Sequence, residues 1–199
     1  MNFNKNFISG NVCNNMDQPQ KFPLPNLGIA VKGFHGTKKG YAGKSKESNK
    51  FHRSNEANDW LGHGIYFWEN DPSRAIEWAT NKYGEEAAVV EVPINLGRCL
   101  DLTLLSHTEY LKIAYDRYIQ KMKSIGRDIT NYETKPHFLD CSVINYLTSE
   151  LFDVDTIRAP FDIGEPVFPG SYLHRGSHIQ LVVVNEASLI GNVSIYYEA

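Results

Sequence analysis

Strand-like and helix-like segments are segregated along this chain, and this segregation constrains its fold more than any other feature. Hydrophobic patterning predicts one helix opening at 70–73 and two adjacent helices in the middle of the chain, at about 108–125 and 138–151. Strands are predicted at 28–35, 64–68, 87–96, 155–160, 177–185 and 192–198. This order favours an α+β architecture over a doubly wound parallel sheet.

The helix that opens at residues 70–73 has the clearest local signals. Asp71 is a good N-cap residue, Pro72 suits a first helical turn, and Ala75 and Ala79 lie on one apolar face. We therefore expect this helix to follow directly from the strand before it.

Other residues predict where strands end and where the chain forms a loop or a sheet edge. Gly36 and Thr37 are expected to end the first strand, and residues 38–50 show no hydrophobic periodicity, which predicts a loop. Pro93 lacks a backbone donor, so we expect its strand to lie at a sheet edge.

A chain of 199 residues with 42% hydrophobic residues is long enough for one domain with one sizeable core. We expect that domain to occupy residues 26–199. Residues 1–25 predict an extension, poorly ordered or draped over the domain, because Asn is frequent there and Pro23 and Pro25 favour extended backbone.

The composition excludes several classes of protein. A formal net charge of −3 creates no overall field toward nucleic acid or membrane, and no apolar stretch reaches transmembrane length. The cysteines Cys13, Cys99 and Cys141 have no paired spacing, which disfavours a disulfide framework and indicates a reducing, cytoplasmic setting. The seven histidines also lack metal-ligand spacing, and no P-loop or G-x-G-x-x-G motif occurs, so we expect no metal site.

Four short motifs stand out from this composition. They offer an imidazole beside a glycine, glycines before an aromatic strand, an aromatic on the next helix, and a polar start to a buried strand. The motifs are Phe34-His-Gly-Thr37, Leu61-Gly-His-Gly-Ile-Tyr-Phe67, Ser73-Arg-Ala-Ile-Glu-Trp78 and Ser177-His-Ile-Gln-Leu-Val-Val-Val184. Taken singly, each also fits an ordinary structural role, such as a His35 satisfied by backbone or an edge-strand Gln180 directed to solvent.

In this order the motifs resemble those of the H-Y-E type of ADP-ribosyltransferases, the group that includes diphtheria toxin and the poly(ADP-ribose) polymerases. The resemblance runs from about Gly28 to Ile190, and small bacterial toxin and phage-defence members look most similar. It implies an NAD-binding cleft between two split antiparallel β-sheets with flanking helices, and NAD as the substrate.

The resemblance also implies roles for single residues. His35 matches the histidine that hydrogen-bonds the adenosine ribose, and Gly36 the glycine whose backbone holds the nicotinamide carboxamide. Tyr66 matches the tyrosine that packs on the nicotinamide ring. The remaining NAD-binding candidates are Thr37, Gly64 and, as a second aromatic for the other face of the ring, Trp78.

Gln180 stands where the family has its catalytic glutamate. An amide can hydrogen-bond a ribose 2′-hydroxyl but carries no charge, and a carboxylate about 4 Å from a unit cation is worth roughly 4 kcal/mol at an effective dielectric near 20. Transfer is then slow, another carboxylate reaches the site, or the protein binds NAD without cleaving it. Glu165, on the Pro- and Gly-rich segment before the last motif, is the candidate carboxylate.

That segment ends at His178, which shares a strand face with Gln180 because side chains repeat every two residues. His178 is a candidate for positioning or deprotonating the acceptor. The basic segment from Lys38 to Arg53 is a candidate contact for the NAD pyrophosphate or a nucleic-acid acceptor, although a solvated surface also explains its charge.

From the resemblance we expect an enzyme, an NAD-dependent mono-ADP-ribosyltransferase that modifies a nucleic acid or a protein. Such a protein acts as a toxin or defence effector, and an inhibitory antitoxin is then a further partner. Two alternatives stay open: an NAD glycohydrolase, in which water is the acceptor, and a catalytically silent NAD-binding module.

Overall fold

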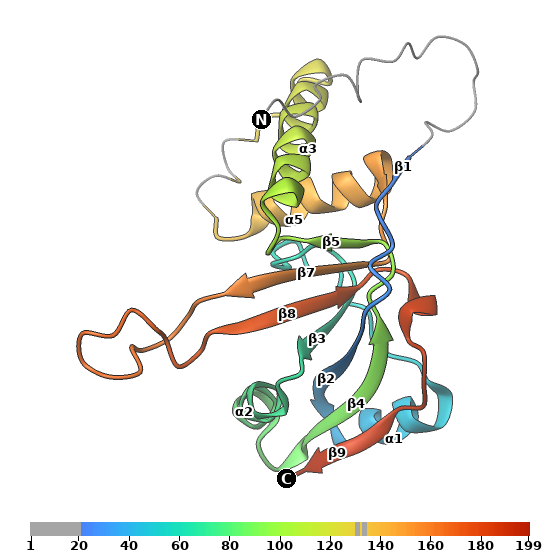
Figure 1. Ribbon diagram of the computed structural model, residues 1–199, viewed down its shortest axis with the longest axis vertical. Coiled ribbons are helices and arrows are strands. Elements are labelled where there is room, and N and C mark those ends of the chain that lie inside the picture. Colours follow the sequence, from blue (N-terminus) through green and yellow to red (C-terminus); the bar gives the residue numbers. More distant parts are fainter. Residues whose placement is uncertain (1–20, 130–131, 133–134) are drawn as a thin grey trace.

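Seven strands of the computed structural model, which describes residues 21–129, 132 and 135–199, join into one mixed sheet (Figure 1). Their spatial order is β5-β7-β8-β3-β2-β4-β9, and β5 and β7 run parallel while the other neighbours are antiparallel. The strands are β2 (Ala30–Lys38), β3 (Ile65–Glu69), β4 (Ala87–Asn95), β5 (Cys99–Asp101), β7 (Thr156–Phe161), β8 (His178–Val183) and β9 (Ser194–Glu198). Two short strands, β1 (Phe22–Pro23) and β6 (Phe152–Asp153), pair separately. The fold is α+β, as expected.

The junction between β2 and β3 divides this sheet into two parts. The two strands pair only at Gly33↔Glu69 and Phe34↔Trp68, whereas β2 and β4 pair along the whole length of β2. In Figure 1, β7 and β8 run at a large angle to β2 and β4. Hydrogen bonding therefore gives one sheet with a parallel pair, where we expected two separate antiparallel sheets, and this sheet opens locally between β2 and β3.

Helices cover the sheet on both faces. They are α1 (Lys39–Ser48), α2 (Pro72–Tyr83), α3 (Leu105–Ser124) and α5 (Phe138–Tyr146), which continues into a π-helical turn at Leu147–Leu151; 3-10 turns lie at Gly84–Glu86 and Glu186–Ser188. α1 and α2 lie beside β2 and β4, while α3 and α5 lie beyond β5 (Figure 1). The expected start of α2 is confirmed, because the Asp71 carboxylate accepts a hydrogen bond from the Arg74 N–H at 3.1 Å.

Three clusters of buried side chains follow from this arrangement. α2 packs Ala75 and Ala79 on a cluster with Phe34 and Trp68, whereas Ala42 of α1 joins a cluster on the opposite face of the same strands. α3 and α5 form a third cluster with β5, β7 and β8. Among the described helices, α2 packs on Trp68 of β3 and α5 on Val182 of β8, and the strip of the sheet between these contacts is left open at Tyr66 and Gln180.

The prediction of a loop at 38–50 is wrong. β2 continues through Gly36 and Thr37 to Lys38, and α1 follows immediately. α1 buries only Ala42 and Ser45, so it has no apolar stripe that a periodicity analysis can detect.

Pro93 does not mark an edge strand, because β4 lies between β2 and β9. The β4–β9 pairing covers Ala88 to Glu91, so Pro93 lies beyond the part of β4 that β9 covers. The missing N–H is therefore tolerated, because no strand pairs with that side of Pro93, where the Pro93 carbonyl accepts from the Ile190 N–H.

The start of the described chain is packed against the domain. Phe22 and Pro23 form β1, and Leu24 is 4% exposed within the cluster of α3 and α5. Residues 1–20, which hold most of the predicted extension together with Cys13, lie outside the described residues. Cys99 and Cys141 are buried free thiols. None of the described helices is long and apolar enough to cross a lipid bilayer.

Candidate functional site

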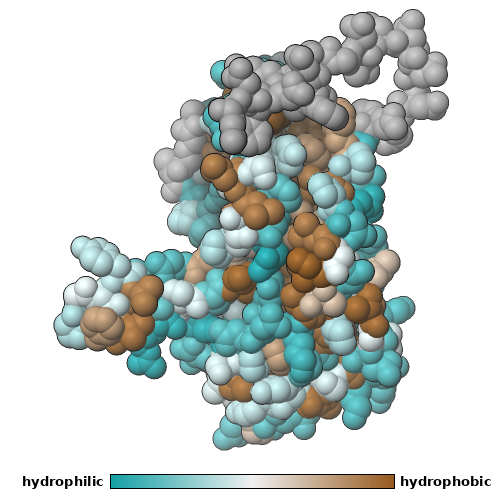
Figure 2. All heavy atoms as spheres, in the orientation of Figure 1, coloured by the Kyte–Doolittle hydropathy of each residue, from teal (hydrophilic) through white to brown (hydrophobic). Residues whose placement is uncertain are grey.

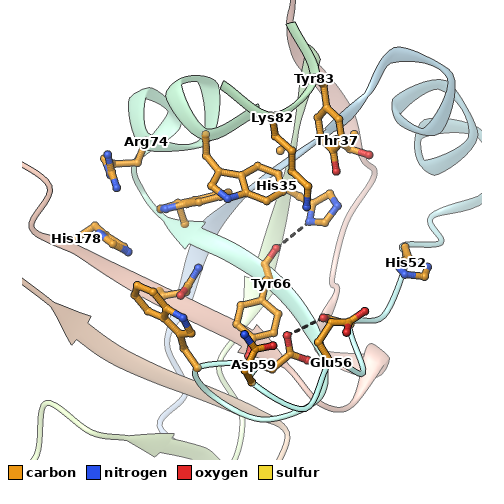
Figure 3. Close-up of a pocket in the computed structure, with 18 of the residues that line it drawn as sticks. His35, Thr37, His52, Glu56, Asp59, Tyr66, Arg74, Lys82, Tyr83 and His178 are labelled. Atoms are coloured by element: carbon orange, nitrogen blue, oxygen red, sulfur yellow. Dashed lines mark hydrogen bonds between the residues drawn. The ribbon is translucent and has the colours of Figure 1, made fainter. Parts of the chain in front are cut away.

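A cavity of about 690 Å³ opens over the uncovered strip of the sheet, beside α2 (Figure 3). All four sequence motifs contribute to its lining. The predicted residues that it brings together are His35, Gly36, Thr37, Gly64, Tyr66, Trp78, His178 and Gln180. A cavity of this size is in the range of small-molecule and cofactor sites.

The His35 side chain lies in the opening between β2 and β3. Its Nδ1 is 2.8 Å from the Tyr66 carbonyl oxygen, an interaction drawn in Figure 3, and its ring packs against Phe51 and Phe67. A carbonyl only accepts, so Nδ1 carries the proton and Nε2 of the neutral ring is a free acceptor. Burial lowers the pKa of His35 below its ordinary value, which favours this neutral form.

The backbone of Gly36 faces the same opening. The N–H and C=O of Lys32 both hydrogen-bond Asn70, so the backbone groups of Lys32 point toward β3. Along a strand, the backbone groups of every second residue point to the same neighbouring strand. The N–H and C=O of Gly36, four residues after Lys32, therefore also point toward β3. The β2–β3 register would place Tyr66 opposite Gly36, but pairing ends at Phe34↔Trp68 and His35 takes the Tyr66 carbonyl. A donor and an acceptor of Gly36 are thus presented side by side at the cavity.

Gly36 is also required by packing. A Cβ at this position would lie 2.9 Å from Cε3 of Trp78 and 3.1 Å from the Ala75 carbonyl oxygen. Only glycine lets α2 approach β2 this closely.

Tyr66 contributes its ring and not its hydroxyl to the cavity. The hydroxyl donates to the Gly62 carbonyl at 2.7 Å and accepts from the Leu61 N–H at 3.0 Å. Burial raises the pKa of Tyr66, so the phenol stays protonated. Tyr66 is therefore a fixed aromatic surface and not a proton donor for chemistry.

Gly64 lies where the chain enters β3. A Cβ there would be 2.3 Å from Cγ1 of Val182, so Gly64 allows close approach of β8. Gly64 also lines the cavity.

Gln180 lies in the middle of the sheet and not at an edge. It pairs with Trp68 of β3 on one side and with Ala159 of β7 on the other, and its side chain lines the cavity. His178 lines the same cavity, as expected for two residues on one strand face, and stacks on Phe161. Its Nδ1 is 2.6 Å from the Gly176 carbonyl oxygen, so Nε2 is the free ring acceptor of neutral His178.

Aromatic rings form the wall that α2 contributes. Trp78 is 37% exposed and contacts Trp68 at a ring separation of 5.4 Å and Tyr83 at 5.8 Å. The Lys82 ammonium lies 4.5 Å from the centre of the Trp78 ring. This wall can stack on a flat ring and carries positive charge at its surface.

Glu165 does not line the cavity. It lies on an exposed hairpin, residues 162–177, which projects away from the domain in Figure 1. Figure 2 shows hydrophobic side chains gathered on this projection, where Phe168 is 60% and Leu173 71% exposed.

The carboxylates that do line the cavity are Glu56 and Asp59, which sequence reasoning missed. Asp59 accepts hydrogen bonds from Ser54 Oγ and the Glu56 N–H, and burial raises its pKa. Both residues precede the Gly-rich motif in a segment without periodicity. Other lining residues, to which the sequence assigned no role in the site, are Tyr41, His52, Ser54, Asn58, Trp60, Trp68, Arg74, Lys82, Tyr83 and Ile163.

The basic residues from Lys38 to Arg53 lie outside the cavity lining. Arg53 instead donates to the carbonyls of Val184 and His63, which ties the segment before β3 to the end of β8. No group of His, Cys, Asp and Glu with metal-binding geometry occurs among the residues that the structure describes.

Comparison of the chain with models of protein families, with characterised proteins and with solved structures finds no match.

Proposed function

We propose that this protein is an ADP-ribosyltransferase that cleaves NAD and transfers a single ADP-ribose to a macromolecule. One observation carries the proposal: the β2–β3 pairing ends at Phe34, His35 takes the Tyr66 carbonyl, and Gly36 and Tyr66 line the same cavity. Strand alternation then directs the N–H and C=O of Gly36 toward this cavity. A primary carboxamide on a flat ring, as in nicotinamide, can accept from the Gly36 N–H with its carbonyl oxygen and donate one of its two amide N–H groups to the Gly36 C=O.

The walls of the cavity fit the nicotinamide ring, which is aromatic and positively charged, and the ribose next to it. Tyr66 and Trp78 offer ring faces to the nicotinamide, and the cation on the pyridinium favours aromatic surfaces. The Nε2 acceptor of His35 is suited to a ribose hydroxyl. These contacts hold the nicotinamide in place while its bond to the ribose weakens.

The chemical step needs no acid for the leaving group. The electron pair of the C–N bond moves to the pyridinium nitrogen, nicotinamide leaves neutral, and positive charge develops on the ribose, as in glycoside cleavage. An acceptor oxygen or nitrogen then bonds to the ribose carbon and loses its proton. His178 Nε2 is available to receive that proton, because Nδ1 is held by Gly176.

Gln180 is proposed to hydrogen-bond the ribose 2′-hydroxyl. Without a carboxylate at this position, stabilisation of the developing cation depends on the charge of Glu56 and Asp59 across the cavity. Transfer is therefore expected to be slow. The projecting hairpin, whose end leads into His178, is proposed to contact the acceptor, and toxin or defence activity with an antitoxin partner is the setting we propose.

The proposal is tested by incubating the purified protein with NAD labelled in its adenine half and a cell lysate. Half of each reaction is then treated with nuclease and half with protease. Label that one of these treatments releases supports transfer and identifies the acceptor class. Free ADP-ribose alone supports the glycohydrolase, and binding without nicotinamide release supports the silent module.

A variant of Gln180 tests whether its side chain contributes to nicotinamide release. Gln180→Ala removes one hydrogen bond to the ribose, so we expect nicotinamide release to fall by about tenfold to a hundredfold. Arg127→Gln, on the surface far from the cavity lining, is the control and should behave as the parent protein. Full activity of Gln180→Ala would show that Gln180 does not have the proposed role at the ribose.

A further inference from the structure

Two residues that line the cavity each have a buried N–H group with no hydrogen-bond acceptor among the described residues. These groups are Nε1 of Trp68, a residue only 5% exposed, and Nε of Arg74. Leaving a buried donor unsatisfied costs about 1–3 kcal/mol. Such groups therefore call for an explanation, and a ligand that supplies the acceptor is one.

The two donors come from neighbouring parts of the chain. Trp68 lies at the end of β3 and Arg74 in the first turn of α2, which follows directly. Trp68 also pairs with Gln180 across β3 and β8, so their side chains are neighbours on one sheet face. In Figure 3, Arg74 and His178 lie at the same end of the cavity, opposite His52 and Glu56.

The cation at this end of the cavity is Arg74. Nη1 of Arg74 donates to Glu77, which is exposed and leaves Nε of Arg74 unpaired. Lys82 also lines the cavity, and within the described chain no carboxylate lies in ion-pair distance of its ammonium. Figure 3 places Lys82 beside His35 and Thr37, away from Arg74, so Arg74 is the cation at the end near His178. Glu56 and Asp59 are the carboxylates in the opposite part of the cavity.

We propose that Arg74 and Trp68 form a subsite for a phosphate group beside Gln180. A guanidinium offers several N–H donors in a fixed plane, and an indole adds one uncharged donor, which suits an anion with several oxygen acceptors. In an ADP-ribosyltransferase, the phosphate belongs either to the pyrophosphate of NAD or to the backbone of a nucleic-acid acceptor. This use of the subsite rests on the proposed function, whereas the binding of phosphate does not.

The test uses inorganic pyrophosphate as the probe and tryptophan fluorescence as the readout, because Trp68, Trp78 and Trp60 all line the cavity. The parent protein should bind pyrophosphate, with an affinity that falls as salt is added. Arg74→Gln should bind about tenfold more weakly, because it loses a charge-assisted hydrogen bond. Glu77→Gln should bind more tightly, since it removes the carboxylate that competes for Arg74.

Arg127→Gln is the matched control, because it removes the same charge from a surface outside the cavity lining. It should bind pyrophosphate as the parent protein does. Equal affinities of the parent protein and Arg74→Gln, or no pyrophosphate binding by either, would overturn the subsite. Trp68→Phe provides a second variant: it keeps a ring but removes the N–H, and unchanged affinity there would exclude the indole from the subsite.

Two further measurements identify the source of the phosphate. If Arg74→Gln raises the KM for NAD and leaves binding of a single-stranded RNA unchanged, the subsite serves the pyrophosphate of NAD. If RNA binding weakens and the KM for NAD is unchanged, it serves a nucleic-acid acceptor. Pyrophosphate binding without any cleavage of NAD would support the subsite and contradict the proposed function, so the two failures are distinguishable.

Discussion

His35 connects the separation of β2 and β3 with the proposed NAD site. Its Nδ1–H occupies the Tyr66 carbonyl that Gly36 would otherwise use, and its Nε2 is left as an acceptor. The same imidazole thus keeps β2 and β3 apart and frees the Gly36 backbone. In this fold, the His of the His-Gly motif occupies the carbonyl of the neighbouring strand, and the Gly leaves its backbone toward the cavity.

The protonation of His35 gives a pH-dependent prediction. Burial lowers its pKa, so the neutral form persists at pH values down to and below the ordinary 6.5, and protonation at lower pH removes the Nε2 acceptor. We expect NAD affinity, measured by calorimetric titration, to be constant between about pH 8 and 6.5 and to fall below that range. An affinity that already falls between about pH 8 and 7 would contradict this assignment.

The same shift predicts the pH dependence of stability. Between the lowered pKa of folded His35 and its ordinary value, the unfolded chain binds more protons, so this group destabilises the fold as pH falls through about 6.5.

Gly36→Ala tests the close approach of α2 to β2. The added Cβ would lie 2.9 Å from Trp78 and 3.1 Å from the Ala75 carbonyl, so we expect a loss of about 1–3 kcal/mol in the free energy of unfolding. Gly43→Ala in α1 is the control, because a Cβ there meets nothing within 4 Å. That helical substitution should stabilise the protein by up to about 1 kcal/mol, measured by chemical denaturation.

At the scale of elements, α2 was predictable and α1 was not. Asp71 and Pro72 signal the start of α2 locally, and Ala75 and Ala79 mark its packed face. α1 instead depends on distant residues: Asn49 caps it in a left-handed conformation, and the Asn49 side chain accepts from the Val193 N–H. Tertiary contacts of this kind leave no periodic signal in the sequence.

Three strands are held together by a buried ionic cluster. Arg158 of β7 donates two hydrogen bonds to Glu69 of β3, at 2.7 and 2.8 Å, and one to Asp101, at the end of β5, at 2.9 Å. The Glu69 and Asp101 side chains are 7% and 6% exposed. Burial opposes the charge of Asp101, but hydrogen bonds from Thr103 and the Arg158 charge outweigh it and lower the pKa of Asp101.

Arg158→Met should destabilise the protein by about 3–5 kcal/mol near neutral pH, because it leaves two buried carboxylates without their cation. The loss should be smaller at about pH 5, where unpaired carboxylates take up protons more readily. Urea unfolding at the two pH values measures both effects. Equal losses at the two pH values would show that the charges are not responsible.

At the scale of the whole molecule, the sequence predicted the cavity only in part. The motifs around His35, Tyr66 and Gln180 carry local signals, and the fold brings them to one cavity. Glu56 and Asp59 lie in a segment without regular structure, so no pattern marks them. Glu165 was placed by nearness in sequence to the last motif, but the hairpin directs it away from the cavity.

The phosphate subsite shows the same limit. Trp68 meets Gln180 through a strand pairing between residues far apart in the sequence, and only the register of β3 on β8 fixes that contact. Sequence order carries no information on such a register when both strands are buried and apolar.

The central claim is tested most directly by a crystal structure with an NAD analogue whose nicotinamide–ribose bond cannot be cleaved. The account predicts the nicotinamide ring on Tyr66, with its carboxamide accepting from the Gly36 N–H and donating to the Gly36 carbonyl. A nicotinamide bound elsewhere, or a carboxamide that makes no contact with the Gly36 backbone, would contradict it.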